Sequence, residues 1–388
     1  MMDQLFVVLK HWLVALAAPG WQPILAAAIS IAAIIGAFAS LFAVTTILER
    51  KGLGRMQNRY GPNRVGPFGL LQPLADGVKS LTKEDLVPAA ADRWVFFLAP
   101  LVLVVPAFLA LSVVPMGRNM TAVALDAGVL FFFAVGAATE LSVFMAGWSS
   151  RNKYSLLGAM RAIAQMVSYE VPLILSAVTA VMMAGSLSTD EIVAAQAGYH
   201  HGLPNWFVLT PWGLAGFLLF LVCAMAESNR SPFDLPEGES EIIAGYYIEY
   251  SGFKFALFFL GEYIGMFAAS GMAITLFLGG WHAPFPFLTW VPSYGWFFAK
   301  LLALIGLFIW VRGTLPRLRM DQLMNLAWKF MLPMALMNIA VAGLWHFSAP
   351  GAARWAACAL LIAGAYLVLG RALFTGAHLG RRVYRYAE

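Results

Sequence analysis

The chain has 388 residues, of which 61% are hydrophobic and 12% are charged, and its formal net charge is +5. The charged share is about half that of ordinary soluble domains and the mean hydropathy is +0.76, so the composition predicts an all-α, polytopic helical membrane protein. The apolar runs are nearly continuous rather than alternating, which argues against a transmembrane barrel. The sequence has no basic patch with interleaved aromatic residues, so binding to nucleic acid is not indicated.

The N-terminal stretch, residues 1–23, is predicted to be a short interfacial segment. Lys10 interrupts its apolar run and no clear cleavage site follows, so it is a poor match to a signal peptide. Nine apolar stretches of about 20 residues each then follow as candidate membrane-spanning helices. They cover residues 24–48, 94–115, 128–148, 158–184, 212–227, 255–280, 296–315, 322–347 and 354–375.

The charge of the connecting loops predicts the orientation of the chain. Loops after odd-numbered spans hold 19 Lys and Arg residues, whereas loops after even-numbered spans hold two. Because positively charged loops remain in the cytoplasm, the N-terminus is predicted to lie outside and the C-terminus in the cytoplasm. The same rule places both long polar stretches, 49–93 and 228–254, on the cytoplasmic side.

The first polar stretch combines an irregular segment with a predicted amphipathic helix. Glycines and prolines in residues 52–67 are expected to prevent a long helix there. Leu71, Leu74, Val78 and Leu81 then recur at three- and four-residue steps, which predicts a helix with one apolar face. This helix is too short and polar to span a membrane. Two interpretations remain, a surface anchor in the interface plane or one wall of a cavity that binds an amphiphile.

Four acidic residues lie inside predicted spans or at their ends, namely Glu140, Glu170, Glu227 and Glu262. A charge at mid-bilayer costs about 2.5–3.5 kcal/mol on insertion scales, so several such acids indicate a continuous hydrated path. Pro172 cannot donate a hydrogen bond to the preceding turn, which loosens the helix beside Glu170 and could admit water. The alternative for any single acid is protonation or a hydrogen bond to a neighbouring helix.

An acidic cluster lies between the fifth and sixth predicted spans. Seven of the 20 acidic residues fall within residues 227–262, where Pro232 and Pro236 end the preceding helix. Carboxylates this close together resist ionising at the same time, so the cluster could exchange protons near neutral pH. The alternative is a solvated acidic loop that docks a basic partner.

The sequence contains no recognisable cofactor motif. Cys223 and Cys358 lie far apart in apolar runs, and neither has a second ligand at metal-binding spacing. No glycine-rich phosphate loop and no catalytic nucleophile motif is present. The sequence therefore predicts a protein with no metal site, no catalytic residue and no tightly bound cofactor of its own.

Three long motifs resemble those of a known family. The first covers residues 49–85, the second is RAIAQMVSYE at 161–170, and the third begins as RSPFDLPEGESE at Arg230 and continues to Glu262. In this order they resemble the H subunit of respiratory complex I, the proton-pumping NADH:quinone oxidoreductase, whose mitochondrial equivalent is NADH dehydrogenase subunit 1. The resemblance covers about residues 24–347.

The resemblance implies a place where the membrane arm of the complex meets its peripheral arm, in a bacterial inner membrane. The partners would be the other membrane subunits and the peripheral subunits that carry the terminal iron–sulfur cluster. Quinone, either ubiquinone or menaquinone, would be the substrate and would enter a chamber from the bilayer. By matching position, the quinone-binding residues would be Arg50, Arg59, Asp76, Arg230 and Phe233. The acids that couple quinone reduction to proton translocation would be Asp234, Glu237, Glu239, Glu241, Glu170, Glu227, Glu249, Glu262 and, as in only part of the family, Glu140.

The resemblance also implies a division of the chain. Residues 1–23 would be the interfacial segment, 24–347 an eight-helix quinone-chamber domain, and 348–388 an extra helix and basic tail whose role is open. Three alternatives remain: the equivalent subunit of a hydrogenase or of a complex with another electron donor, a stand-alone ion transporter, and a structural membrane anchor. The absence of a repeat between the two halves argues against the transporter, and the anchor leaves the intramembrane acids unexplained.

Overall fold

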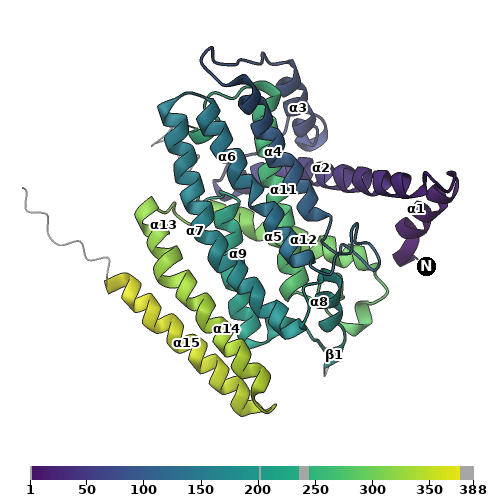
Figure 1. The fold of residues 1–388 in the computed structure, drawn as a ribbon, viewed down its shortest axis with the longest axis vertical. Helices are drawn as coiled ribbons and strands as arrows, with labels where there is room; N and C mark the ends of the chain where they lie inside the picture. The colour runs from purple at the N-terminus through teal and green to yellow at the C-terminus, as the bar shows by residue number, and fades with distance from the viewer. Residues whose placement is uncertain (1, 201, 236–243, 376–388) are drawn as a thin grey trace, which may run out of the picture.

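The long helices of the chain pack side by side into a bundle (Figure 1). The computed structural model describes residues 2–200, 202–235 and 244–375. The α-helices in these ranges are α1 (Leu5–Ala15), α2 (Gln22–Met56), α3 (Gln72–Thr82), α4 (Arg93–Leu111), α5 (Gly128–Gly136), α6 (Ala138–Ser149), α7 (Lys153–Ala184), α8 (Thr189–Ala195), α9 (Pro211–Glu227), α11 (Gly252–Phe277), α12 (Ser293–Thr314), α13 (Met320–Leu326), α14 (Leu332–Phe347) and α15 (Ala352–Thr375). The shorter elements are the 3-10 turns η1 (Met2–Gln4), η2 (Pro67–Gly69), η3 (Phe207–Leu209), η4 (Gly245–Tyr247) and η5 (Pro286–Leu288), the π turn η6 (Ala327–Met331), and the antiparallel strands β1 (Tyr199–His200) and β2 (Leu203–Pro204).

All nine predicted spans are helical in the described ranges. Eight helical stretches are long and apolar enough to cross a membrane, with α5 and α6 counted as one stretch and α13 to α14 as another. The ninth is α9, which has 17 residues. At 1.5 Å per residue it extends about 26 Å, slightly less than the hydrocarbon core of about 30 Å. The chain is therefore an all-α, multi-pass membrane protein, as its composition predicts.

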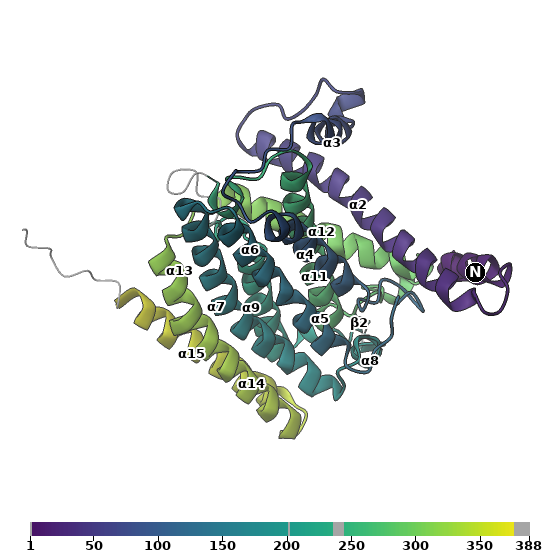
Figure 2. The same cartoon turned by 45° about the horizontal axis from the view of Figure 1, so that its top comes forward.

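Helix α11 lies at the centre of the bundle and contacts α4, α9 and α12. Every residue from Met266 to Phe277 is buried, so this half of the helix has no face toward the surroundings. A helix that is apolar on all sides is expected at such a position. Helix α15 lies at the edge of the bundle instead, against α14 and α9 (Figures 1 and 2).

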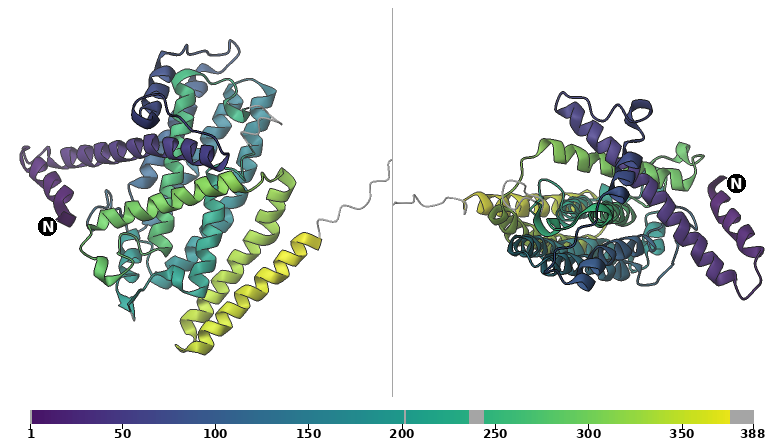
Figure 3. Two further views of the ribbon diagram at one scale, coloured as in Figure 1. Left: turned by 180° about the vertical axis from the view of Figure 1, so that it is seen from behind. Right: turned by 90° about the horizontal axis from the view of Figure 1, so that it is seen from above.

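Helices α1 and α2 project from the opposite side of the bundle. Figure 3 shows α2 crossing beside α12, with α1 folded back at its outer end. Few side chains of α2 are buried, and none of α1 is buried beyond the intermediate class. The short N-terminal helix predicted for the interface is therefore present as α1.

Helix α2 is longer than predicted, because it continues to Met56 through the glycines of the first polar stretch. The prediction that glycines prevent a long helix was wrong for Gly52 and Gly54, which lie inside the helix, but residues 57–66 are irregular as predicted. Gly54 allows the following loop to fold back on the helix, where the N–H of Arg59 donates to the carbonyl of Gly54 at 2.8 Å. A Cβ on Gly54 would lie 3.0 Å from the nitrogen of Gly61, and one on Gly61 would lie 2.9 Å from the Cα of Lys51. Close backbone approach explains both glycines here.

The amphipathic helix is confirmed as α3. Its apolar positions Leu71, Leu74, Val78 and Leu81 are all exposed in the isolated chain, by 49% to 69%. Figure 2 shows α3 outside the bundle, next to the C-terminal end of α2. An exposed apolar face of this kind fits both a surface anchor and a cavity wall.

Candidate functional site

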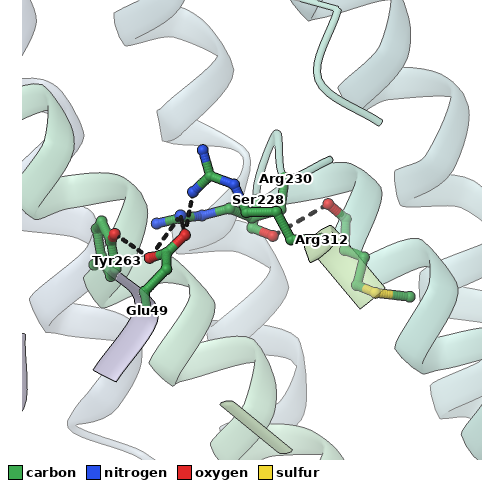
Figure 4. A network of polar contacts seen from close by, with 6 residues as sticks. Glu49, Ser228, Arg230, Tyr263 and Arg312 are labelled. Atoms are coloured by element: carbon green, nitrogen blue, oxygen red, sulfur yellow. Dashed lines mark hydrogen bonds and ion pairs between the residues drawn. The ribbon is translucent and has the colours of Figure 1, made fainter. Parts of the chain in front are cut away.

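Four side chains from distant segments meet in a buried ionic cluster (Figure 4). Glu49 lies near the end of α2, Arg230 just after α9, Tyr263 on α11 and Arg312 in the last turn of α12. Nη1 of Arg230 donates to both carboxylate oxygens of Glu49, at 3.0 and 3.3 Å. Arg312 and the hydroxyl of Tyr263 donate to the same carboxylate. Two guanidinium groups thus surround one carboxylate, and the cluster carries an excess of positive charge.

Arg230 is only partly satisfied by this cluster. Its guanidinium carbon lies 3.9 Å from the centre of the Tyr263 ring, in cation–π contact. Burial alone would lower the pKa of Arg230, but the facing Tyr263 and Glu49 raise it above the ordinary value, so the group stays charged. Its Nε and Nη2 are buried and have no hydrogen-bond partner among the described residues. Buried N–H groups of a guanidinium are rarely left unpaired, so these two donors are suited to an acceptor from outside the cluster.

The segment that carries Arg230 is held by a buried amide. Nε2 of Gln165 on α7 donates to the carbonyls of Ala226 and Phe233, at 2.7 and 2.6 Å. The Phe233 ring packs against the Tyr169 ring with centroids 5.5 Å apart and an edge-on angle. These contacts fix residues 226–233 as they leave α9, which explains why a loop with two prolines places Arg230 in one defined position.

A second candidate site lies between α5, α7, α9 and α11. Glu170, Glu227 and Glu262 line a cavity of about 70 Å³, which has room for a few water molecules. Glu140, in the first turn of α6, lies close enough to Glu170 for the two carboxyl groups to interact electrostatically. Tyr246 donates its hydroxyl to Glu262 at 2.9 Å. The structure therefore brings together four acids that are spread over more than 120 residues of sequence.

Glu140 lies near the middle of the third span, Gly128–Ser149, as expected from the sequence. This span is interrupted at Ala137, between α5 and α6, although Ala137 keeps right-handed helical backbone angles. Glu140 lies in the first turn after this interruption.

The other predicted site residues lie apart from these two sites. Nη1 of Arg50 pairs with Asp76 at 2.5 Å, and both side chains are exposed. Arg59 is exposed and donates to Gln57. Glu249 is half-buried and accepts a hydrogen bond from the amide of Asn152 at 2.7 Å, and Asp234 is half-buried beside Phe233. Three of the predicted acids lie outside the described residues, namely Glu237, Glu239 and Glu241.

The sequence reasoning missed three members of the ionic cluster: Glu49, Tyr263 and Arg312. Glu49 is adjacent to Arg50 in the first motif, and Tyr263 follows Glu262 in the third, so both lay within recognised stretches. Arg312 had one available signal, since it is a cation inside the end of an apolar span and such a cation needs a partner. No group of three or more metal-ligating side chains occurs in the described part of the chain.

Comparison with known proteins identifies the relatives of this chain. Residues 29–343 match the family described as NADH dehydrogenase. An H subunit of the NADH-quinone oxidoreductase of Geobacter metallireducens is 49% identical over 313 residues, which cover 78% of this chain and 91% of that protein. The H subunit of the Dehalococcoides mccartyi strain CBDB1 enzyme is 52% identical over 303 residues, covering 78% and 82%. The H subunit of the Geobacillus kaustophilus enzyme is 46% identical over 345 residues, covering 88% of this chain and all of that protein.

Proposed function

The chain belongs to the NADH dehydrogenase family that includes the H subunit of NADH-quinone oxidoreductase, and from this premise we propose that it forms the quinone-binding chamber of such a complex. We infer that it also couples quinone reduction to proton translocation. Quinone would be its substrate, and partner subunits would carry the electrons. The chain would lie in a bacterial inner membrane with its N-terminus outside and its C-terminus in the cytoplasm.

The half-satisfied guanidinium of Arg230 is the observation that carries the quinone part of the proposal. A quinone has two carbonyl oxygens that accept hydrogen bonds, and its reduction adds negative charge to them. Buried Nε and Nη2 groups without a partner among the described residues supply the donors that such an oxygen needs. The excess positive charge around Glu49 then favours the reduced, more negative headgroup, because a buried fixed charge acts strongly in a low dielectric.

Replacing Arg230 tests this role. In the assembled complex, Arg230→Gln should lower NADH-dependent quinone reduction about 10- to 100-fold, the loss expected for a charge-assisted hydrogen bond of about 1.5–3 kcal/mol. Reduction of a water-soluble artificial acceptor by the peripheral arm should be unchanged. Arg230→Lys, which keeps the charge, should retain more activity than Arg230→Gln. Arg118→Gln in an exposed loop is the control, and equal quinone reduction in Arg230→Gln and Arg118→Gln would refute the role.

The acid-lined cavity supports the coupling part of the proposal. Glu227 ends α9 three residues before Arg230, so the same short segment contributes to both sites. A change in charge near Arg230 therefore acts on Glu227 across a short distance of protein with low dielectric. Glu227 lines the cavity together with Glu170 and Glu262, and Glu140 interacts electrostatically with Glu170. A few water molecules and four carboxyl groups are sufficient parts for a proton relay.

Glu227→Gln tests the relay. In proteoliposomes that contain the whole complex, it should lower the number of protons moved per NADH oxidised, because the amide cannot take up a proton. Glu191→Gln, at an exposed position in α8, is the matched control. An unchanged ratio of protons to NADH in Glu227→Gln, with normal assembly, would exclude Glu227 from the path.

A further inference from the structure

Helices α14 and α15 lie on the side of the bundle opposite to α2 (Figures 1 and 3). A large apolar groove lies between these two helices and α9. Its volume is about 860 Å³, at the upper end of the range of about 300–1,000 Å³ that is usual for small-molecule sites. Leu218 and Met225 of α9, Met334 of α14 and Ala363 of α15 are among its apolar walls, and Phe233 lies at one end. Helix α15, which forms one wall, lies beyond the residues that match the family.

The dimensions of the groove suit the hydrocarbon chains of a lipid. Its three helices are apolar and of spanning or nearly spanning length, so we expect the groove to lie at the depth of the bilayer. The lining positions of α9 from Pro211 to Met225 rise by about 21 Å, about two-thirds of a hydrocarbon core of about 30 Å. An apolar groove of this length accommodates acyl chains. Without an occupant, its walls would lose dispersion contacts.

Three basic residues are sequence neighbours of residues that line the groove, namely Arg317, Arg319 and Lys329. The N–H of Leu318 donates to the carbonyl of Pro232, which brings residues 317–319 to the end of the groove near Phe233. Arg317 and Arg319 flank Leu318 in the sequence, and Lys329 precedes Phe330. Both Leu318 and Phe330 line the groove. Arg319 and Lys329 are exposed and Arg317 is half-buried, so the mouth of an otherwise apolar groove carries accessible positive charge.

Among the described residues at this end of the groove, Arg317, Arg319 and Lys329 outnumber the acids Asp234 and Asp321. Asp321 is the one acidic residue within residues 315–330, against three basic ones. Within the described part of the chain, Arg317 makes a marginal contact of 3.5 Å with the carbonyl of Leu235. Basic residues beside a groove between transmembrane helices are the arrangement that binds anionic lipid headgroups.

We propose that this groove binds an anionic diacyl phospholipid. Its acyl chains lie along α9, α14 and α15, and its phosphate lies at Arg317, Arg319 and Lys329. The positive mouth selects this occupant over a zwitterionic phospholipid, which brings no net charge, and over an isoprenoid quinone, which brings no charge at all. The bound lipid also packs against Phe233, so it supports the segment that carries Arg230.

The test uses the intact complex in nanodiscs that contain phosphatidylglycerol or phosphatidylcholine with a photoactivatable group in one acyl chain. After irradiation, cross-links to peptides of α9, α14 and α15 are quantified by mass spectrometry. Phosphatidylglycerol should label these peptides more strongly than phosphatidylcholine. Replacing Arg317, Arg319 and Lys329 with Gln should reduce its labelling by up to about fivefold for each residue.

Two matched variants of α15 separate occupation of the groove from general contact with lipid. Ala363→Trp fills the groove and should abolish labelling of its walls. Leu360→Trp adds a similar ring on the same helix at a position that is 72% exposed and does not line the groove, and it should leave the labelling unchanged. Arg118→Gln is the control for loss of a basic residue elsewhere.

Four results would overturn the proposal. Equal labelling by both lipids would show that the groove does not select an anionic headgroup. Labelling that persists in Ala363→Trp would show that the probe binds outside the groove. Displacement of the phosphatidylglycerol probe by added isoprenoid quinone would make the groove a quinone site. Protection of the groove from both probes in the intact complex would make it an interface with a neighbouring subunit.

Discussion

The ionic cluster makes a quantitative prediction for Glu49→Gln. The side chains of Glu49 and Arg230 are 7% and 10% exposed, whereas that of Arg312 is 32% exposed. Removing the carboxylate charge deprives the buried Arg230 of the anion that it contacts, and breaking a buried pair in this way costs about 3–5 kcal/mol. Gln keeps the size of Glu and one acceptor, so we expect a loss of about 3 kcal/mol in the free energy of unfolding.

The loss in the free energy of unfolding should be larger for Glu49→Gln than for Arg312→Gln. Arg312 is about one-third exposed, so its loss should cost about 1 kcal/mol or less. The double variant Glu49→Gln with Arg230→Gln removes both buried charges, and its cost should be smaller than the sum of the two single costs. The free energies would be measured on the purified chain in mixed micelles, by titration with SDS and tryptophan fluorescence. A smaller loss for Glu49→Gln than for Arg312→Gln, or strict additivity in the double variant, would refute this account of the cluster.

Three further predictions concern other contacts. Asp76→Asn should change the free energy of unfolding by less than about 1 kcal/mol, because the pair with Arg50 is exposed; a larger loss in the same titration would mean that this pair is shielded. Gln165→Leu removes the side-chain donor to the carbonyls of Ala226 and Phe233, so it should lower the free energy of unfolding by about 2–3 kcal/mol. It should also slow quinone reduction. A normal rate of quinone reduction would show that residues 226–233 keep their position without Gln165. Burial, and then the charge of Lys300, lower the pKa of His282 below its ordinary value of 6.5, so the unfolded chain binds a proton more readily than the folded one. The contribution of His282 to stability is therefore present above pH 6.5 and declines as the pH falls below it, and His282→Asn should flatten this part of a plot of melting temperature against pH.

Local patterns in the sequence were sufficient for most of the fold. Each apolar run of spanning length is a helix, and the three- and four-residue spacing from Leu71 to Leu81 marks α3. These features depend on residues close together in the chain. The end of α2 was missed because Gly54 remains helical, where its missing Cβ makes room for the distant backbone of Gly61. The interruption at Ala137 was missed because no proline marks it in the sequence.

The candidate site was predictable only in part, because its key contacts join distant residues. Arg230 was singled out through its motif, but its partners Glu49 and Arg312 lie 181 and 82 positions away. No periodicity reports such a contact, and each residue alone resembles an ordinary charge at a helix end. The acids Glu170 and Glu227 were expected in one hydrated path, and the structure places both on one cavity. Their role in proton transfer stays a prediction.

The buried helix α11 has a mechanical consequence. Glu262 and Tyr263 are neighbours on this helix, yet one belongs to the acid-lined cavity and the other to the ionic cluster. One turn further along, from Met266, the helix is enclosed on every side and has little freedom to rotate independently. A tilt or axial shift of this rod would move both side chains together, by similar amounts and without delay. The ionic cluster and the acid-lined cavity are therefore mechanically coupled through α11, in addition to any electrostatic coupling between them.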